Sequence, residues 1–352
     1  MKLQICVDPP SGTGQVVVTV IVGLLLATPA SAHCRLLQVA ELPVDAAHNR
    51  PLIAGQINGQ AVKILVDTGS QTSVVTRSTA NRLGLKQVSS SSTSRGVGGE
   101  VKEYNTSLKQ LTLDKFTVHD LAMPVAVEGE RNFDMILGEN FFAQFTVEFD
   151  LAHGAIRLFK PKGCRADQLA YWSQTYSLAD LASSPTDSLR IETTVSLNGR
   201  ALRAILDTGA TLSTVSRTAT VGLGISIDEN SHTHAMGIGR DAVDSWVGKF
   251  EKFTVGDETI QNVSLFIVDT TKHNELMTTR SRIPETYELP HMLIGADFFL
   301  AHRVLIYGAD RKMVFTYLGG PVFDANQLHR NAEASSNSQE PNSAEPTPKE
   351  PR

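Results

Sequence analysis

The chain has 352 residues, of which 41% are hydrophobic and 20% are charged, as is typical of a globular protein of two or three domains. Its formal net charge is −5, its pI is near 6.1, and no run of Lys and Arg stands out. This balance argues against a nucleic-acid partner, so function has to be inferred from particular sites.

The first residues have the pattern of an export signal. Residues 17–26 form an apolar stretch too short to span a bilayer, and Ala30-Ser31-Ala32 is a small-x-small cleavage pattern. We expect a signal peptide over residues 1–32 and a periplasmic or secreted protein with no stable membrane span after cleavage. The segment before the apolar stretch is long and carries both Lys2 and Asp8. A downstream start and an uncleaved anchor therefore stay open.

Two cysteines remain after the presumed cleavage, Cys34 in an N-terminal extension over 33–49 and Cys164. In an oxidising compartment they could form a disulfide, and two unpaired thiols are the alternative. Neither has the neighbours of a nucleophile or the spacing of a metal site. We expect no metal and no cofactor.

The next segment combines a hairpin, a buried strand and a reactive loop. Asn58-Gly59 predicts a two-residue type I′ turn, because both residues tolerate positive φ. Residues 62–66 are rich in Val, Ile and Leu and predict a central β-strand, and residues 78–83 predict a short helix. The strand ends at Asp67-Thr68-Gly69-Ser70. Here we expect Gly69 to let the backbone turn sharply beside the carboxylate.

Two further glycine-containing elements follow in this half. Residues 95–99 form a glycine-rich tip, and Gly138 follows two large apolar residues in the run 135–142. Such a glycine suits a place where another backbone approaches closely, here the strand that carries the aspartate. Residues 161–188 then form a linker whose Tyr171, Trp172 and Tyr176 indicate packing against a lobe.

The second half repeats this order. Asn198-Gly199, the apolar run 202–206 and Asp207-Thr208-Gly209-Ala210 are followed by a glycine-rich tip over 236–240 and by Gly295. Aligned without gaps, residues 58–85 and 198–225 are identical at 11 of 28 positions, which indicates a duplicated unit. The second copy carries about 17 additional polar residues between 269 and 289, which predict a long surface loop. Residues 319–352 predict a disordered tail.

With two matched Asp-Thr-Gly loops and two matched glycine elements, the chain resembles the retropepsin-like aspartic proteases. The resemblance covers most of residues 50–160 and 189–318. It implies an all-β fold with two retropepsin-like β-barrel lobes in tandem, related by the pseudo-two-fold arrangement of pepsin-like enzymes. Viral members follow the late glycine with arginine, whereas this chain has Glu139 and Ala296, then Asn140 and Asp297.

The resemblance implies a site at the contact of the two lobes. Its catalytic residues would be Asp67 and Asp207, because one of two facing carboxylates can accept a proton while the other donates one. Thr68 and Thr208 would hydrogen-bond across the contact. The supporting residues implied are Thr68, Gly69, Ser70, Thr208, Gly209 and Ala210, and the flap residues are Gly96, Val97, Gly98, Gly237, Ile238 and Gly239.

The fourth residue of each loop differs between the copies. The hydroxyl of Ser70 can donate a hydrogen bond to Asp67, whereas Ala210 offers Asp207 no such donor. This difference predicts that Asp67 is the ionised partner and that Asp207 holds the proton.

These observations predict an aspartic endopeptidase that acts on peptide or protein substrates as a monomer, since one chain carries both aspartates. A peptide-binding module of the same fold without activity is the alternative. His232 and His234 have a metal-like spacing, but the sequence shows no third ligand, so we expect them to face solvent.

Overall fold

The computed structural model describes residues 34–96, 99–127, 131–182, 189–225, 227–237, 242–269 and 291–323, without the side chains of Arg95 and Met236. The predicted signal peptide, the loop predicted between 269 and 289 apart from Asp269, and residues 324–352 lie outside these ranges. Within the described ranges, no helix has both the length and the hydropathy that crossing a membrane requires.

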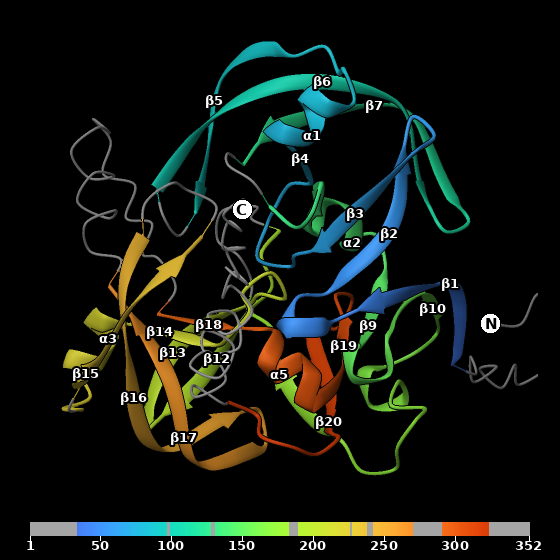
Figure 1. The fold of residues 1–352 in the computed structure, drawn as a ribbon. Helices are drawn as coiled ribbons and strands as arrows, with labels where there is room; N and C mark the ends of the chain where they lie inside the picture. Colours follow the sequence, from blue (N-terminus) through green and yellow to red (C-terminus); the bar gives the residue numbers. More distant parts are fainter. Residues whose placement is uncertain are drawn as a thin grey trace, which may run out of the picture. The chain divides into compact units, whose positions relative to one another are not determined.

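The first lobe is a six-stranded barrel with one additional strand. The strands pair in the order β2-β3-β8-β4-β7-β6, and β2 also pairs with β6, which closes the ring. β5 extends the ring beyond β6 (Figure 1). The strands are β2 (Leu52–Ile57), β3 (Gln60–Val66), β4 (Val74–Thr76), β5 (Val88–Gly96), β6 (Gly99–Leu113), β7 (Phe116–Ala126) and β8 (Met135–Leu137), with short helices α1 (Arg77–Arg82) and α2 (Glu139–Phe142).

The second lobe repeats this topology strand for strand. Its order is β12-β13-β18-β14-β17-β16, closed by pairing of β12 with β16, and β15 extends it as β5 extends the first. The strands are β12 (Glu192–Leu197), β13 (Arg200–Leu206), β14 (Thr214–Ser216), β15 (Ile227–Met236), β16 (Ala242–Val255), β17 (Glu258–Val268) and β18 (Met292–Ile294), with helices α3 (Arg217–Val221) and α5 (Ala296–Ala301). The predicted all-β duplication is confirmed.

Local sequence explains the start of each barrel. Asn58 and Gly59 have φ of 52° and 80°, and Asn198 and Gly199 have φ of 49° and 84°, as a type I′ turn requires. The strand after each turn buries Val, Ile and Leu side chains in the lobe core. Each strand therefore ends directly before an aspartate, Asp67 in the first lobe and Asp207 in the second.

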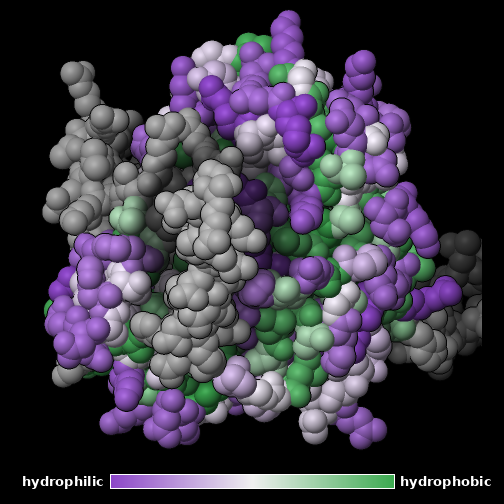
Figure 2. All heavy atoms as spheres, in the orientation of Figure 1, coloured by the Kyte–Doolittle hydropathy of each residue, from purple (hydrophilic) through white to green (hydrophobic). Residues whose placement is uncertain are grey.

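The exposed strand β5 is polar. It contains five serines between residues 89 and 94, and all of them are exposed or partly exposed. Figure 2 shows hydrophilic side chains over the upper part of the view, where β5, β6 and β7 lie in Figure 1. This end of the first lobe is therefore solvated.

A third sheet joins the two lobes. Its strands pair in the order β11-β20-β19-β9-β10-β1, and β9 of the first half pairs directly with β19 of the second (Figure 1). They are β1 (Arg35–Asp45), β9 (Thr146–Asp150), β10 (Ala155–Lys162), β11 (Ser177–Asp180), β19 (His302–Tyr307) and β20 (Lys312–Tyr317), and short 3-10 turns are η1 (Ala47–Asn49), η2 (Leu151–His153) and η3 (Ala166–Gln168). The N-terminal extension and the linker thus both contribute strands.

The linker packs as its aromatic residues predict. The indole N–H of Trp172 donates to Thr316 Oγ1 at 3.1 Å, and the ring of Tyr171 contacts that of Phe159. The first residues assigned to the predicted tail are packed, because Val322 and Phe323 are both buried and the ring of Phe323 contacts second-lobe aromatic rings.

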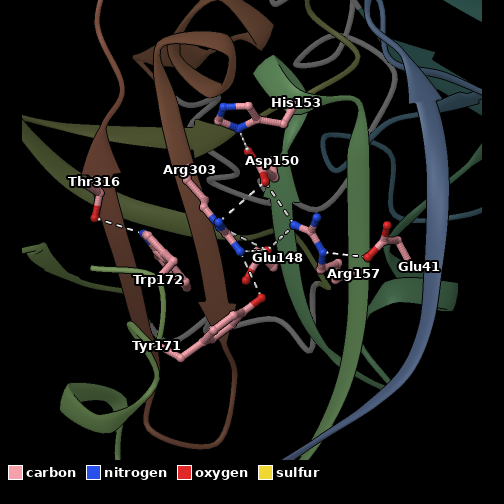
Figure 3. Close-up of polar contacts among 9 residues, drawn as sticks. All are labelled: Glu41, Glu148, Asp150, His153, Arg157, Tyr171, Trp172, Arg303 and Thr316. Atoms are coloured by element: carbon pink, nitrogen blue, oxygen red, sulfur yellow. Dashed lines mark hydrogen bonds and ion pairs between the residues drawn. The ribbon is translucent and has the colours of Figure 1, made fainter. Parts of the chain in front are cut away.

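A buried carboxylate holds the third sheet together. Glu148 on β9 is fully buried and accepts hydrogen bonds from Arg157 on β10 and from Arg303 on β19 (Figure 3). Nη1 of Arg157 also contacts Asp150, and its Nε forms an ion pair with Glu41 at the surface. One carboxylate therefore bridges an arginine of each half.

Cys34 and Cys164 form a disulfide in the structure, across 130 residues of sequence and with a Cα–Cα distance of 4.3 Å. The bond links the residue before β1 to the residues that follow β10, which is the antiparallel neighbour of β1. It therefore encloses the whole first lobe in a covalent loop.

Candidate active site

Asp67 and Asp207 each stand at the end of a buried strand. The strands β3 and β13 pair in parallel with β8 and β18. The backbone N–H of Asp67 donates to Leu137 at 3.0 Å, and that of Asp207 donates to Ile294 at 2.8 Å. Each aspartate is therefore fixed at its backbone before its loop begins.

The two threonines fix the loops to each other. The N–H of Thr68 donates to Thr208 Oγ1 at 3.1 Å, and the N–H of Thr208 donates to Thr68 Oγ1 at 3.0 Å. Each hydroxyl then donates to a carbonyl of the opposite lobe, Thr68 to Leu206 and Thr208 to Val66. Both threonines are fully buried, so these four bonds form away from water and place the loops symmetrically.

Each glycine of the loops lies against the aspartate of the other lobe. A Cβ atom on Gly69 would lie 2.4 Å from Cγ of Asp207, and one on Gly209 would lie 2.3 Å from Cγ of Asp67. Neither glycine has positive φ. The predicted turn beside each carboxylate is present, since the N–H of Ser70 donates to the carbonyl of Asp67 and that of Ala210 to the carbonyl of Asp207, each at 3.2 Å. Glycine is also required in this turn because the opposite carboxylate occupies the space of a side chain.

The two carboxyl groups have different electrostatic surroundings. Burial raises the pKa of both groups, and the pKa of Asp67 is raised further by the charge of Asp207 and by the hydrogen bond between them. The pKa of Asp207 is held down by N–H donors of Ala210 and Gly209, each at 3.0 Å, by the bond with Asp67 and by the positive charge of Arg190. N–H donors of Ser70 and Gly69 act on Asp67 in the same way, so the positive charge of Arg190 is what distinguishes the surroundings of Asp207.

The prediction that the Ser70 hydroxyl favours a charge on Asp67 is wrong. The hydroxyl of Ser70 donates to the carbonyl of Thr72 at 2.9 Å, so it is not directed at the carboxylate. The backbone N–H of Ser70 donates to Asp67 at 2.9 Å, as that of Ala210 does to Asp207. The difference between the two aspartates therefore comes from groups outside the loops.

Glu139 is a third carboxyl group beside the pair. It occupies the first position of α2 and is 3% exposed, and its N–H donates to the carbonyl of Ser70 at 2.8 Å. Burial and then the charge of Asp67 raise its pKa to about 8. Among the described residues its Oε1 has no hydrogen-bond partner. Glu139 is therefore uncharged at neutral pH, and it replaces the arginine of viral retropepsins by a neutral group.

The next position braces each loop from behind. Asn140 Oδ1 accepts from the N–H and hydroxyl of Ser73, and Asp297 accepts from the same groups of Ser213. Each serine hydroxyl in turn accepts from the N–H of the late glycine. Burial raises the pKa of Asp297 to about 6. The serine in each lobe needs an oxygen that accepts its hydrogen bonds. The amide of Asn140 supplies this oxygen in the first lobe, and the carboxyl group of Asp297 supplies it in the second.

We expect Glu139→Gln to stabilise the protein at neutral pH but not in acid. Glu139 has an ordinary pKa of 4.5 in the unfolded chain, so folding must take up a proton between about pH 4.5 and 8. At pH 7 this uptake costs on the order of 3 kcal/mol, from 1.36 kcal/mol per pH unit. Glutamine carries no charge in either state. The gain, about 1–3 kcal/mol at pH 7, is measured by urea unfolding at pH 4.5 and 7.

Glu251→Gln is the matched control, because Glu251 is exposed on β16 and remains in water in both states. The control should change stability equally at both pH values. A Glu139→Gln gain that is the same at pH 4.5 and 7 would show that Glu139 is charged in the folded protein.

The predicted flap residues are described only in part. Gly96 ends β5 and pairs with Gly99, the first residue of β6. The carbonyl of Gly237 accepts from Arg131 Nη2 of the first lobe at 3.1 Å. Val97, Gly98, Ile238 and Gly239 lie outside the described residues.

Three residues near these features were not predicted from the sequence. Arg190 precedes β12. Glu139 follows the late glycine, and the sequence showed only that it differs from the arginine of viral family members at this position. Asp244 lies on β16 opposite His234, and its carboxylate contacts both His232 and His234. The sequence could have indicated Asp244 only through the hairpin register, which the sequence leaves undetermined.

Family models of aspartyl proteases match both halves of the chain. Residues 53–144 match the family model of gag-polyprotein aspartyl proteases, and residues 193–298 match a second model, described as aspartyl protease. Among 444 matching chains of solved structures is an aspartic proteinase from Irpex lacteus, at 13% identity and a TM-score of 0.45, covering 80% of this chain and 97% of that one. No match was found among curated proteins.

Proposed function

Because the chain belongs to the retropepsin-like aspartic proteases, with one such domain in each half, we propose that it is an endopeptidase whose catalytic residues are Asp67 and Asp207. The observation that carries the proposal is the crossed contact of each carboxylate with the opposite loop glycine. This contact brings one carboxylate from each lobe to the same point. A buried pair of this kind shares one proton over a range of pH.

The surroundings of the pair support a division of roles. In the proposed mechanism Asp207, which the positive charge of Arg190 favours in its charged form, accepts a proton from a water molecule while the water oxygen attacks the peptide carbonyl carbon. Asp67 donates its proton to the carbonyl oxygen, which gives a neutral tetrahedral diol. Proton transfer from Asp207 to the amide nitrogen then breaks the C–N bond and releases the amine. Asp67 regains its proton from the diol as the carboxylic acid forms.

The test is an assay of the purified protein on a peptide library from pH 3 to 7, with and without a statine-type mimic of the tetrahedral diol. We expect a bell-shaped pH profile, because cleavage needs one protonated and one charged carboxyl group, and we expect inhibition by the mimic. Specific activity should not fall on dilution, since one chain supplies both aspartates. Peptide binding without cleavage at any pH would favour the inactive binding module.

We also propose that the protein is exported. The disulfide between Cys34 and Cys164 supports an oxidising compartment, in which such bonds form and persist. Mass spectrometry of the protein recovered from its natural host tests both points. The proposal requires an N-terminus near His33 and an oxidised cysteine pair, and reduced cysteines on an uncleaved chain would contradict it.

A further inference from the structure

The geometry of the β15–β16 hairpin points to a metal site, and we propose that His232, His234 and Asp244 bind a divalent transition-metal ion of the Zn²⁺ class. The three side chains come from two adjacent strands of the second lobe, at the end of the hairpin that leads to Gly237. One ligand atom from each residue lies within 4.8 Å of the others.

Strand geometry brings the three groups together. His232 and His234 are two residues apart on β15, so their side chains point to the same face of the sheet. Asp244 is the direct partner of His234 across the antiparallel pair. The pairing of β15 with β16 therefore supplies the third ligand that the sequence alone does not show.

The distances suit a small metal ion. His232 Nε2 lies 3.0 Å from Asp244 Oδ1, and His234 Nδ1 lies 3.4 Å from the same oxygen. Tetrahedral Zn²⁺ with bonds of about 2.0–2.1 Å needs ligand atoms about 3.4 Å apart. Two imidazoles and one carboxylate form a donor set that Zn²⁺ accepts, and the fourth position is left for water.

Two side chains pack beside the ligands, Trp246 and Arg217. The ring of His232 lies against Trp246, with ring centroids 5.3 Å apart. The guanidinium of Arg217 lies over the ring of Trp246 and contacts Asp269 at 3.4 Å. The two histidines are 44% and 60% exposed, so an ion can enter from solvent.

The first lobe provides an internal comparison. Tyr104 lies under Arg77 as Trp246 lies under Arg217, so the pair Thr93 and Lys102 of β5 and β6 stands where the second lobe has His234 and Asp244. The hairpin therefore forms without these ligands. Their presence in one copy only is not required by the fold, which favours a role in binding.

A bound ion would tie β15 to β16 three residues before Gly237. The carbonyl of Gly237 accepts a hydrogen bond from Arg131 of the first lobe. The bound ion would therefore hold the hairpin near its contact with the other lobe. We expect the ion to slow amide hydrogen exchange in residues 232–247, because opening the strands would then require loss of a ligand.

The test is calorimetric titration of tag-free protein with ZnCl₂, followed by hydrogen exchange with and without Zn²⁺. We expect one site per chain, with affinity reduced at least about tenfold in Asp244→Asn and in His234→Ala. His119→Ala is the control, because His119 is exposed on β7 and lies outside the cluster. Circular dichroism verifies the fold of each variant.

Three results would overturn the proposal. They are no binding by the wild type, equal binding by folded Asp244→Asn, and equal binding by folded His234→Ala. Unchanged exchange in residues 232–247 on Zn²⁺ addition would overturn the expected tie between the strands. None of these readouts depends on peptide cleavage.

Discussion

Asp67→Asn and Asp207→Asn will each lower kcat by at least about a thousandfold, because each removes one partner of the proton transfers on which the proposed cleavage depends. Both variants should fold. Asparagine keeps the size of the side chain and keeps an oxygen that accepts from the N–H of Ser70 or Ala210. The measurement is the cleavage rate of one peptide at the optimum pH, with melting temperature as the test of folding.

Asp120→Asn is the matched control. Asp120 is exposed on β7 with φ of 51°, a conformation that asparagine adopts readily, so its activity should equal that of the wild type. Turnover near the wild-type rate in folded Asp67→Asn or Asp207→Asn would exclude the paired mechanism.

The second large effect is expected far from the aspartates, at the sheet between the lobes. Glu148→Ala should destabilise the protein by about 3–5 kcal/mol, because it leaves two buried arginine contacts without their shared carboxylate (Figure 3). Asp150 still faces both arginines, but at 3.6 Å from Arg303 it does not replace a 2.8 Å contact. Urea unfolding at pH 7 measures the loss.

Glu41→Ala tests whether burial is the reason. Glu41 binds the same Arg157 at 2.7 Å, but its side chain is 48% exposed, and exposed ion pairs contribute about 0–1 kcal/mol. The two losses should therefore differ severalfold. If both variants lost the same free energy of unfolding, the buried carboxylate of Glu148 would not be what stabilises the contact between the halves. Glu148→Gln provides a milder substitution if the alanine variant does not fold.

The sequence predicted the features that are encoded locally. The Asn-Gly turns, the apolar strands and the paired Asp-Thr-Gly loops are each determined by a few neighbouring residues. Because the motif occurs twice, the sequence also indicated that Asp67 and Asp207 would meet. The hydrogen bonds of Thr68 and Thr208 were implied by the family resemblance, and the structure contains them.

The features that were missed depend on distant parts of the chain. Arg303 meets Glu148 across 155 residues, and nothing near either residue indicates the partner. Asp244 required the register of a hairpin. The direction of the Ser70 hydroxyl was predicted wrongly because a rotating group can donate to a neighbouring carbonyl as well as to a carboxylate. The turn at Gly69 was predicted, but the carboxylate of Asp207 that excludes a side chain there was not, because it belongs to the opposite lobe.

The crossed contact of glycine and aspartate also limits how the two halves can change independently. A side chain at Gly69 would displace the carboxylate of Asp207, and one at Gly209 would displace that of Asp67. A substitution in one half would therefore impair the half that remained unaltered. In the paired strands β5–β6 and β15–β16 the copies have diverged, from Thr93 and Lys102 to His234 and Asp244. The two halves therefore constrain each other at the aspartates, whereas the sequences of these paired strands have changed in one copy without the other.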